Sequence, residues 1–125
     1  MRLLLDTHAL LWWLADDASL GPAAREAIST PDALVAVSAA SAWEISIKKA
    51  LGKLEAPSDL DTQIVRHQFT PLPITIAHAL AAGSLPGHHH DPFDRMLVAQ
   101  AQSEGLTIVT RDPRLALYGV ATLAA

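Results

Sequence analysis

The 125-residue chain contains no cysteine, and this absence removes several kinds of protein at once. Without cysteine there is no disulfide framework, no thiolate zinc site, no iron–sulfur cluster and no cysteine nucleophile. Packing of apolar side chains, which make up 50% of the sequence, must therefore stabilise the fold. A chain of this length buries enough surface for one core, so we expect a single domain over residues 1–125.

Long apolar runs and an excess of basic residues are also missing. No segment approaches the roughly 20 apolar residues that cross a membrane, and Asp6 follows the first residues too soon for a secretory signal. We therefore expect a cytoplasmic protein without a membrane partner. Nine Lys and Arg stand against thirteen Asp and Glu, a formal net charge of -4. This balance argues against a large basic surface for nucleic acid, so any such contact must be local.

Short apolar segments alternate with amphipathic segments along the chain. Strands are predicted over residues 2–5, 33–37 and 106–110, with a last edge strand over 120–123. Helices are predicted over residues 9–15, 22–29, 41–53, 58–68, 76–82 and 92–104, with one further turn over 115–117. Such alternation predicts an α/β fold, a three-layer α/β/α domain with a mostly parallel central sheet.

Local signals mark the start of the helix over residues 92–104. Asp91 is a good N-cap, Pro92 suits the first helical position, and Asp94 stands where the acid of a capping box would be. The preceding segment, residues 84–90, holds one proline, one glycine and the run His88, His89 and His90, and is predicted to be a loop. A solvated loop is favoured over a metal-binding or phosphate-binding role for these histidines.

Acidic residues follow the ends of the predicted strands. Asp6 directly follows the first strand, and Glu44 lies early in the helix after the second. Asp94 begins the helix that leads into the third strand, and Asp112 follows that strand by two residues. Ligands of open parallel sheets bind outside the carboxyl ends of the strands, and grouped carboxylates repel one another unless a cation lies between them. The pattern predicts a site for a hard divalent ion such as Mg²⁺ or Mn²⁺, suited to phosphoryl chemistry.

Each acid also has a structural explanation. Glu44 can pair with a lysine four residues later, Asp94 can serve as a capping acid, and Asp112 can cap a turn. For Asp91 the N-cap is the better explanation, whereas Asp6 is the strongest functional candidate because an acid after a buried strand usually lies in a cleft. Small hydroxyl residues near the same edge are candidates to orient water or carboxylates: Thr7, Ser38 and Thr110. Large apolar residues such as Leu14, Trp43 and Met96 are expected in the core.

Four blocks of sequence occur in order over nearly the whole chain. They are LLLDTHALLW (residues 3–12), SAWEISIK (41–48), DPFDRMLVAQA (91–101) and TRD (110–112). In content and spacing they resemble a PIN domain, and more narrowly a VapC-type toxin of a type II toxin–antitoxin pair. The resemblance implies a PIN fold and an endoribonuclease that depends on Mg²⁺, with Mn²⁺ as the alternative.

The resemblance also implies roles for particular residues. The family's acids match Asp6, Glu44, Asp94 and Asp112, and Asp91 matches an additional acid that supports the site. The expected reaction is hydrolysis of an RNA phosphodiester without a covalent intermediate. Asp6 and Asp94 are expected to hold the principal metal, and Glu44 and Asp112 to complete the site or position a second ion and the attacking water. A homodimer and a VapB-like antitoxin that keeps the toxin inactive are the implied partners.

Cations near these blocks are expected to guide the RNA backbone. They are Lys48, Lys49, Lys53, Arg95, Arg111 and Arg114. The number of family acids, four, equals the excess of acidic over basic residues, so the rest of the chain is formally neutral. A low net charge therefore does not exclude an RNA partner, because bound divalent ions offset the local negative charge.

Two other classes of α/β protein fail on named residues. A response-regulator receiver needs an aspartate at the end of a central strand and a late lysine, but Ser38 and Arg111 stand at these places. A haloacid-dehalogenase-like phosphatase needs an aspartate where this chain has His8. Two alternatives stay open: a PIN-like binding module without nuclease activity, and a metal nuclease that acts on DNA.

Overall fold

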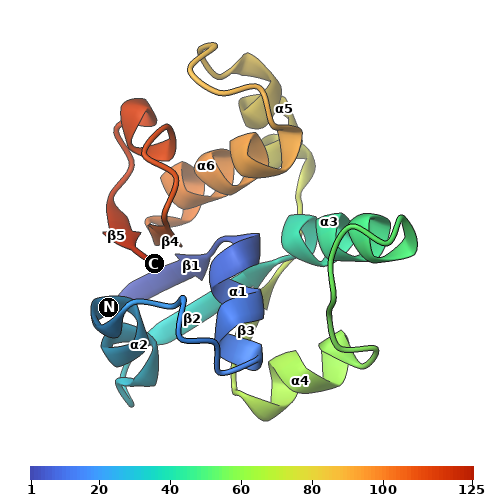
Figure 1. Ribbon diagram of the computed structural model, residues 1–125. Helices are drawn as coiled ribbons and strands as arrows, with labels where there is room; N and C mark the ends of the chain where they lie inside the picture. The colour runs from blue at the N-terminus through green and yellow to red at the C-terminus, as the bar shows by residue number, and fades with distance from the viewer.

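A computed structural model describes all residues from 1 to 125 and contains one five-stranded sheet (Figure 1). The strands are β1 (Arg2–Leu5), β2 (Leu34–Ser38), β3 (Thr70–Leu72), β4 (Thr107–Thr110) and β5 (Thr122–Ala124). Their order is β3-β2-β1-β4-β5, and every neighbouring pair is parallel. The chain winds outward from β1 to β3 and then returns to place β4 beside β1, so the direction of winding reverses at the β1–β4 boundary.

Helices cover both faces of this sheet. They are α1 (Thr7–Leu14), α2 (Pro22–Ser29), α3 (Ala39–Ala50), α4 (Leu60–Arg66), α5 (Ile76–Ser84), α6 (Pro92–Glu104) and the short 3-10 helix η1 (Leu115–Tyr118). Figure 1 shows α5 and α6 on one side of the sheet, with α1, α2 and α4 on the other. This arrangement confirms the predicted three-layer α/β/α class. No helix is both long enough and apolar enough to span a membrane.

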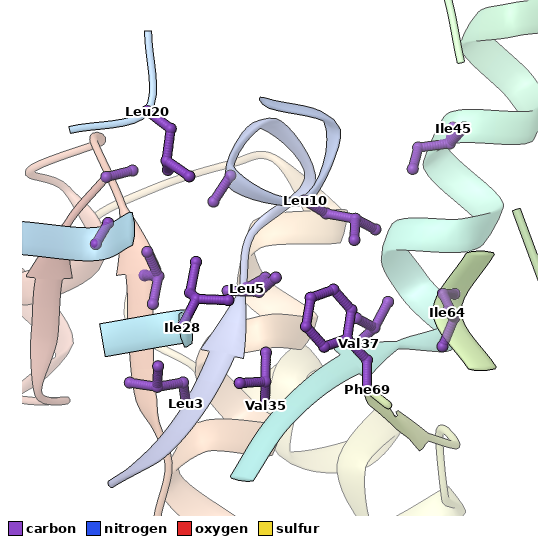
Figure 2. Close-up of a cluster of buried hydrophobic side chains, with 14 residues drawn as sticks. Leu3, Leu5, Leu10, Leu20, Ile28, Val35, Val37, Ile45, Ile64 and Phe69 are labelled. Atoms are coloured by element: carbon purple, nitrogen blue, oxygen red, sulfur yellow. The ribbon is translucent and has the colours of Figure 1, made fainter. Parts of the chain in front are cut away.

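The central strand β1 contributes to the core on both faces. Leu3 and Leu5 point to the side of α1 and α2, where they join a cluster of fourteen buried residues (Figure 2). Leu4 points the other way and packs with Leu97 of α6 and Ile108 of β4 in a second cluster of eight. All three leucines of β1 have no exposed surface. Alternation along one apolar strand thus anchors both helical layers.

Several predicted boundaries shift because polar side chains cap the helices. Helix α1 begins at Thr7, earlier than expected, since Asp6 accepts a hydrogen bond from the backbone N–H of Ala9. Helix α3 covers Ala39–Ala50, with Ser38 as its N-cap, and the expected start at residue 41 was wrong. Helix α4 covers Leu60–Arg66, shorter than the expected 58–68, and no side chain caps its first turn.

The structure differs from the sequence-based prediction in two further ways. The sequence did not predict β3, which spans only three residues, lies at the sheet edge and contains Pro71. Proline is accepted there because an edge strand does not need every backbone N–H for pairing. Trp43 was expected in the core, but it is 62% exposed and makes an edge-to-face contact with Phe93 at 5.5 Å.

Candidate active site

A polar cleft of about 580 Å³ opens beyond the carboxyl ends of β1 and β4. Only one of its twelve lining residues is hydrophobic, and five carry carboxylates. The lining residues are Asp6, Thr7, His8, Trp12, Glu44, Lys48, His89, Asp91, Asp94, Arg111, Asp112 and Arg114. The four acids expected to form the site therefore meet in one cleft, although they come from separate elements.

Asp6 stands at the junction of β1 and α1. Its backbone N–H donates to the carbonyl of Val109 at 3.1 Å, which continues the pairing of β1 with β4. Its Oδ1 accepts from the N–H of Ala9 at 2.8 Å and so caps α1. Burial raises the pKa of the Asp6 carboxyl, while hydrogen bonds from Thr110 and Ala9 act in the opposite direction. A buried carboxylate of this kind is stabilised by a nearby cation.

Glu44 reaches the cleft from α3 and is only 5% exposed. Its Oε1 accepts from the hydroxyl of Thr7 at 2.5 Å, and its Oε2 pairs with the ammonium of Lys48 at 2.5 Å. The hydrogen bond to Glu44 raises the pKa of Lys48. The pairing four residues apart that the sequence suggested is therefore present, and the same carboxylate also lines the cleft.

Asp94 lies in the first turn of α6. Its backbone N–H donates to Asp91 Oδ1 at 2.9 Å, which confirms Asp91 as the N-cap. Its own carboxylate does not complete a capping box, because Oδ2 lies 2.8 Å from Nε2 of His89. Burial, with a smaller contribution from Asp91, raises the pKa of Asp94 to about 6, although the hydrogen bond with His89 opposes the shift.

Asp112 follows β4 and faces the same histidine. Its carboxylate forms a two-point pair with Arg114, at 3.0 Å from Nε and 2.7 Å from Nη2. This pair lowers the pKa of Asp112. Asp112 Oδ2 also lies 3.5 Å from Nε2 of His89. His89, Asp94 and Asp112 thus form a group whose ligand atoms lie within 4.8 Å of one another.

The three small hydroxyl residues have different positions. Thr7 lines the cleft, and Thr110 lies beneath it, where its hydroxyl accepts from the N–H of Asp112 at 3.1 Å. Ser38 does not line the cleft. Its hydroxyl donates to the side chain of Gln100 at 2.6 Å and accepts from the N–H of Ala40. The structure therefore places Ser38 in the packing of α3 against α6 rather than at the site.

Of the predicted RNA-guiding cations, Lys48, Arg111 and Arg114 line the cleft. Arg111 is held in place by the carbonyls of Ser19 and Ala125 and by the ring of Trp12, 4.4 Å away. Lys49 and Lys53 are exposed but lie outside the cleft lining.

Arg95 does not face the cleft, contrary to expectation. Its guanidinium donates hydrogen bonds to four backbone carbonyls, those of Ala82, Leu85, Pro86 and His89. Because these contacts and one to Tyr118 use its donors, the structure assigns Arg95 to holding the loop between α5 and α6.

Sequence reasoning missed three residues that line the cleft: His8, Trp12 and His89. Of these, His89 lies against the acids. A solvated loop was expected for the three histidines, and this is wrong for His89, which is 7% exposed. Its neighbours His88 and His90 are exposed, as expected. Because the three residues are identical, the sequence pattern cannot show that the middle one is buried and its two neighbours are exposed. Only the position of His89 five residues before Asp94 hinted at the contact.

The arrangement is chemically suited to a hard cation. Carboxylates from the β1–α1 junction, α3, α6 and the segment after β4 are concentrated in one place, and the pKa values of Asp6 and Asp94 are raised. Oxygen donors with this much unbalanced charge bind divalent ions well.

Comparison with known proteins agrees with this geometry. The family model described as the PIN domain matches residues 3–121. The chain belongs to the PIN-domain family. The resemblance drawn from the four sequence blocks is thus confirmed. Ribonuclease VapC22 of Mycobacterium tuberculosis is 36% identical over 119 residues, which cover 90% of this chain and 88% of that protein.

Solved PIN-like structures resemble the whole chain. The VapBC2 complex of Rickettsia felis, bound to a DNA fragment from its promoter, has a chain that matches with a TM-score of 0.72 and 14% identity, covering 98% of both chains. A toxin–antitoxin complex from Klebsiella pneumoniae matches with a TM-score of 0.68 and 18% identity, covering 98% of this chain and 96% of that one. At these identities the likeness bears on the fold alone.

Proposed function

We propose that this PIN-domain protein is a metal-dependent endoribonuclease that acts as the toxin of a type II toxin–antitoxin pair. The observation that carries the proposal is the meeting of Asp6, Glu44, Asp94 and Asp112 in one cleft at the β1–β4 boundary. The 36% identity to a protein named as a ribonuclease VapC supports the choice of RNA as substrate. As proposed, residues 1–125 act as one domain in the cytoplasm, where the RNA substrate is.

Asp6 and Asp94 are the proposed ligands of the principal ion, and Glu44 and Asp112 complete the site or position the attacking water. Held by these residues, Mg²⁺ or Mn²⁺ would offset the negative charge of the scissile phosphate and favour deprotonation of the attacking water. Among the protein's own groups, the Thr7 hydroxyl and the Lys48 ammonium fix both oxygens of Glu44. Thr110 orients Asp6, and Asp91 supports Asp94 through the N-cap of α6.

Cations at the rim of the cleft are positioned to meet the RNA backbone. Lys48, Arg111 and Arg114 line the cleft together with the acids, so phosphates entering the cleft encounter positive charge there. The contact is local, as the overall charge of -4 requires.

Cleavage of RNA by the purified chain tests this proposal. We expect cleavage with Mg²⁺ or Mn²⁺, none in excess EDTA, and none by Asp6→Asn. Asn keeps the capping oxygen of α1 but loses the charge, so the variant should still fold. Undiminished cleavage in EDTA, or wild-type activity of Asp6→Asn, contradicts the proposal. Cleavage of DNA but not RNA would favour the DNA-directed alternative, and Mn²⁺ binding without cleavage of either would favour a binding module.

A VapB-like antitoxin is the proposed protein partner. Similar chains were solved in complexes named VapBC2 and toxin–antitoxin complex, which supports this assignment. A small reading frame next to the gene, whose product co-purifies with this chain and stops its RNA cleavage, is the expected finding. A neighbouring product that leaves cleavage unchanged would argue against it.

We also propose a homodimer, formed through the outer face of α3. Trp43 and Ile47 of this helix and Leu51, its C-cap residue, lie four residues apart and are 62%, 36% and 63% exposed. An apolar stripe of this kind favours a protein interface over contact with water. Light scattering should give a dimer for the wild type and a monomer for Trp43→Ser with Leu51→Ser. A monomeric wild type contradicts the assignment.

A further inference from the structure

The loop between α5 and α6 is built to bring one histidine to the acids. The guanidinium of Arg95 donates to the carbonyls of Pro86 at 2.9 Å and of His89 at 3.1 Å. The hydroxyl of Tyr118 accepts from the N–H of His89 at 2.9 Å and lies 2.9 Å from the carbonyl of Pro86, to which it donates. The backbone of His89 is therefore held on both sides by side chains from α6 and η1.

The hydrogen bonds of the His89 ring determine where its proton is. Nδ1 accepts from the backbone N–H of His90 at 3.1 Å, and an accepting nitrogen carries no proton. The proton of the neutral ring is therefore on Nε2. This Nε2–H donates to Asp94 Oδ2 at 2.8 Å and lies 3.5 Å from Asp112 Oδ2.

Two roles are consistent with the grouping of His89, Asp94 and Asp112. As a metal ligand, His89 would have to offer the lone pair of Nε2, but in this tautomer Nε2 carries the proton. As a hydrogen-bond donor to a ligating carboxylate, His89 would instead keep the proton and use it to fix that carboxylate. The hydrogen bonding of Nδ1 to the main chain favours the second role, because it fixes the Nε2–H tautomer.

We propose that His89 is a positioning residue whose Nε2–H fixes Asp94 Oδ2 from the side. Asp94 Oδ1, which makes no hydrogen bond to the protein, is then the oxygen offered to the cation. This role rests on the proposed metal site. In this role one histidine of the run acts on the site, and Arg95 holds the loop that carries this histidine.

Metal titration of the full-length purified chain tests the role, with Mg²⁺, Mn²⁺ and Zn²⁺ as separate probes. His89→Ala removes the donor, His89→Gln replaces it with an amide N–H of similar reach, and His88→Ala changes an exposed neighbour. We expect His89→Ala to lower the affinity for all three ions by a similar factor of about 10–100. His89→Gln should recover affinity to within about threefold, and His88→Ala should bind like the wild type. Thermal unfolding without metal checks that every variant is folded.

The pattern across ions separates the two roles. If Zn²⁺ affinity falls far more than Mg²⁺ affinity in His89→Ala, and His89→Gln does not recover it, then His89 is a ligand and the proposal is overturned. Equal affinity of His89→Ala and wild type overturns the positioning role alone. A wild-type chain that binds none of the ions overturns the proposed metal site together with this role.

Nitrogen-detected NMR gives an independent reading of the ring. The expected spectrum shows the Nε2–H tautomer of His89 both without metal and with Mg²⁺ bound, and the exposed rings of His88 and His90 serve as internal references. An Nδ1–H tautomer in the Mg²⁺-bound protein contradicts the proposal.

Discussion

Leu5 and Asp6 are neighbours in the sequence but belong to two regions with opposite energetics. Leu5 is fully buried in the apolar cluster around β1, where each such side chain contributes roughly 1.5–3 kcal/mol to folding (Figure 2). Asp6 is 8% exposed in the acidic cleft, where burial raises its pKa and so disfavours its charged form. The core therefore stabilises the fold. Burying negative charge in the cleft is unfavourable, and the stability of the core offsets it.

This contrast predicts that substitutions in the two regions have opposite effects. Neutralising an acid of the cleft should remove activity while leaving the metal-free fold as stable as before or more stable. Truncating a side chain of the core should destabilise the fold without touching the chemistry.

The largest effect is expected for Asp94→Asn. This substitution keeps the shape of the side chain and an oxygen for the His89 donor but removes the charge. RNA cleavage should fall by at least about a thousandfold, equivalent to about 4 kcal/mol of barrier. The measurement is the initial rate of RNA cleavage in Mn²⁺, and thermal unfolding checks that the variant is folded. A rate within tenfold of wild type would remove Asp94 from the site.

Leu4→Ala should reduce the stability of the apolar core. Leu4 has no exposed surface and packs between β1 and α6, so its truncation should lower the free energy of unfolding by about 2–5 kcal/mol. Leu117→Ala, a matched change at a 60% exposed leucine, should cost less than about 0.5 kcal/mol. Urea unfolding measures both. Similar losses for the two variants would show that β1 is not the centre of the core.

The pH dependence should have opposite signs with and without metal. The folded pKa of Asp94, about 6, lies above its ordinary value of 3.8, so the folded state binds this proton more tightly. The contribution of Asp94 to metal-free stability is therefore greatest below pH 3.8 and declines as the pH rises through about 6.

Metal binding needs the charged form of Asp94. Mn²⁺ affinity should therefore fall by up to about tenfold for each pH unit below 6. Calorimetric titrations between pH 5 and 7.5, run beside Asp94→Asn, check this. An affinity that does not change across the range would contradict the raised pKa.

The smallest effect is expected at the rim. Arg114 is exposed and pairs with Asp112, so Arg114→Gln should leave the stability of the fold nearly unchanged and weaken RNA binding severalfold. Arg66→Gln, an equal change of charge on the exposed end of α4, should leave RNA binding unchanged. Binding curves at two salt concentrations measure both. Equal weakening by the two variants would mean that net charge, not the rim, attracts RNA.

Particular residues show why the sequence predicted some features and missed others. The apolar run of β1 and the N-cap at Asp91 are local signals, and the structure contains both. The meeting of the acids followed from parallel topology, because residues after neighbouring strands share one edge. By contrast, β3 has three residues and a proline, too little for any periodicity.

The remaining misses depend on tertiary contacts. His89 is buried by Arg95 and Tyr118, which lie 6 and 29 residues away along the chain. Arg95 resembled an RNA-binding cation because its charge is visible in the sequence, whereas the four carbonyls that it contacts are not. Trp43 has an apolar side chain at a helical position, but its contact with Phe93 leaves 62% of it exposed.

Equilibrium unfolding with and without Mn²⁺ tests the central claim most directly, using the wild type and the double variant Asp6→Asn, Asp94→Asn. Without metal, the double variant should be at least as stable as the wild type. Mn²⁺ at one hundred times its dissociation constant should stabilise the wild type by about 2.7 kcal/mol and leave the double variant unchanged. Equal stabilisation of both proteins, or of neither, would contradict the assignment of the cleft as a cation site.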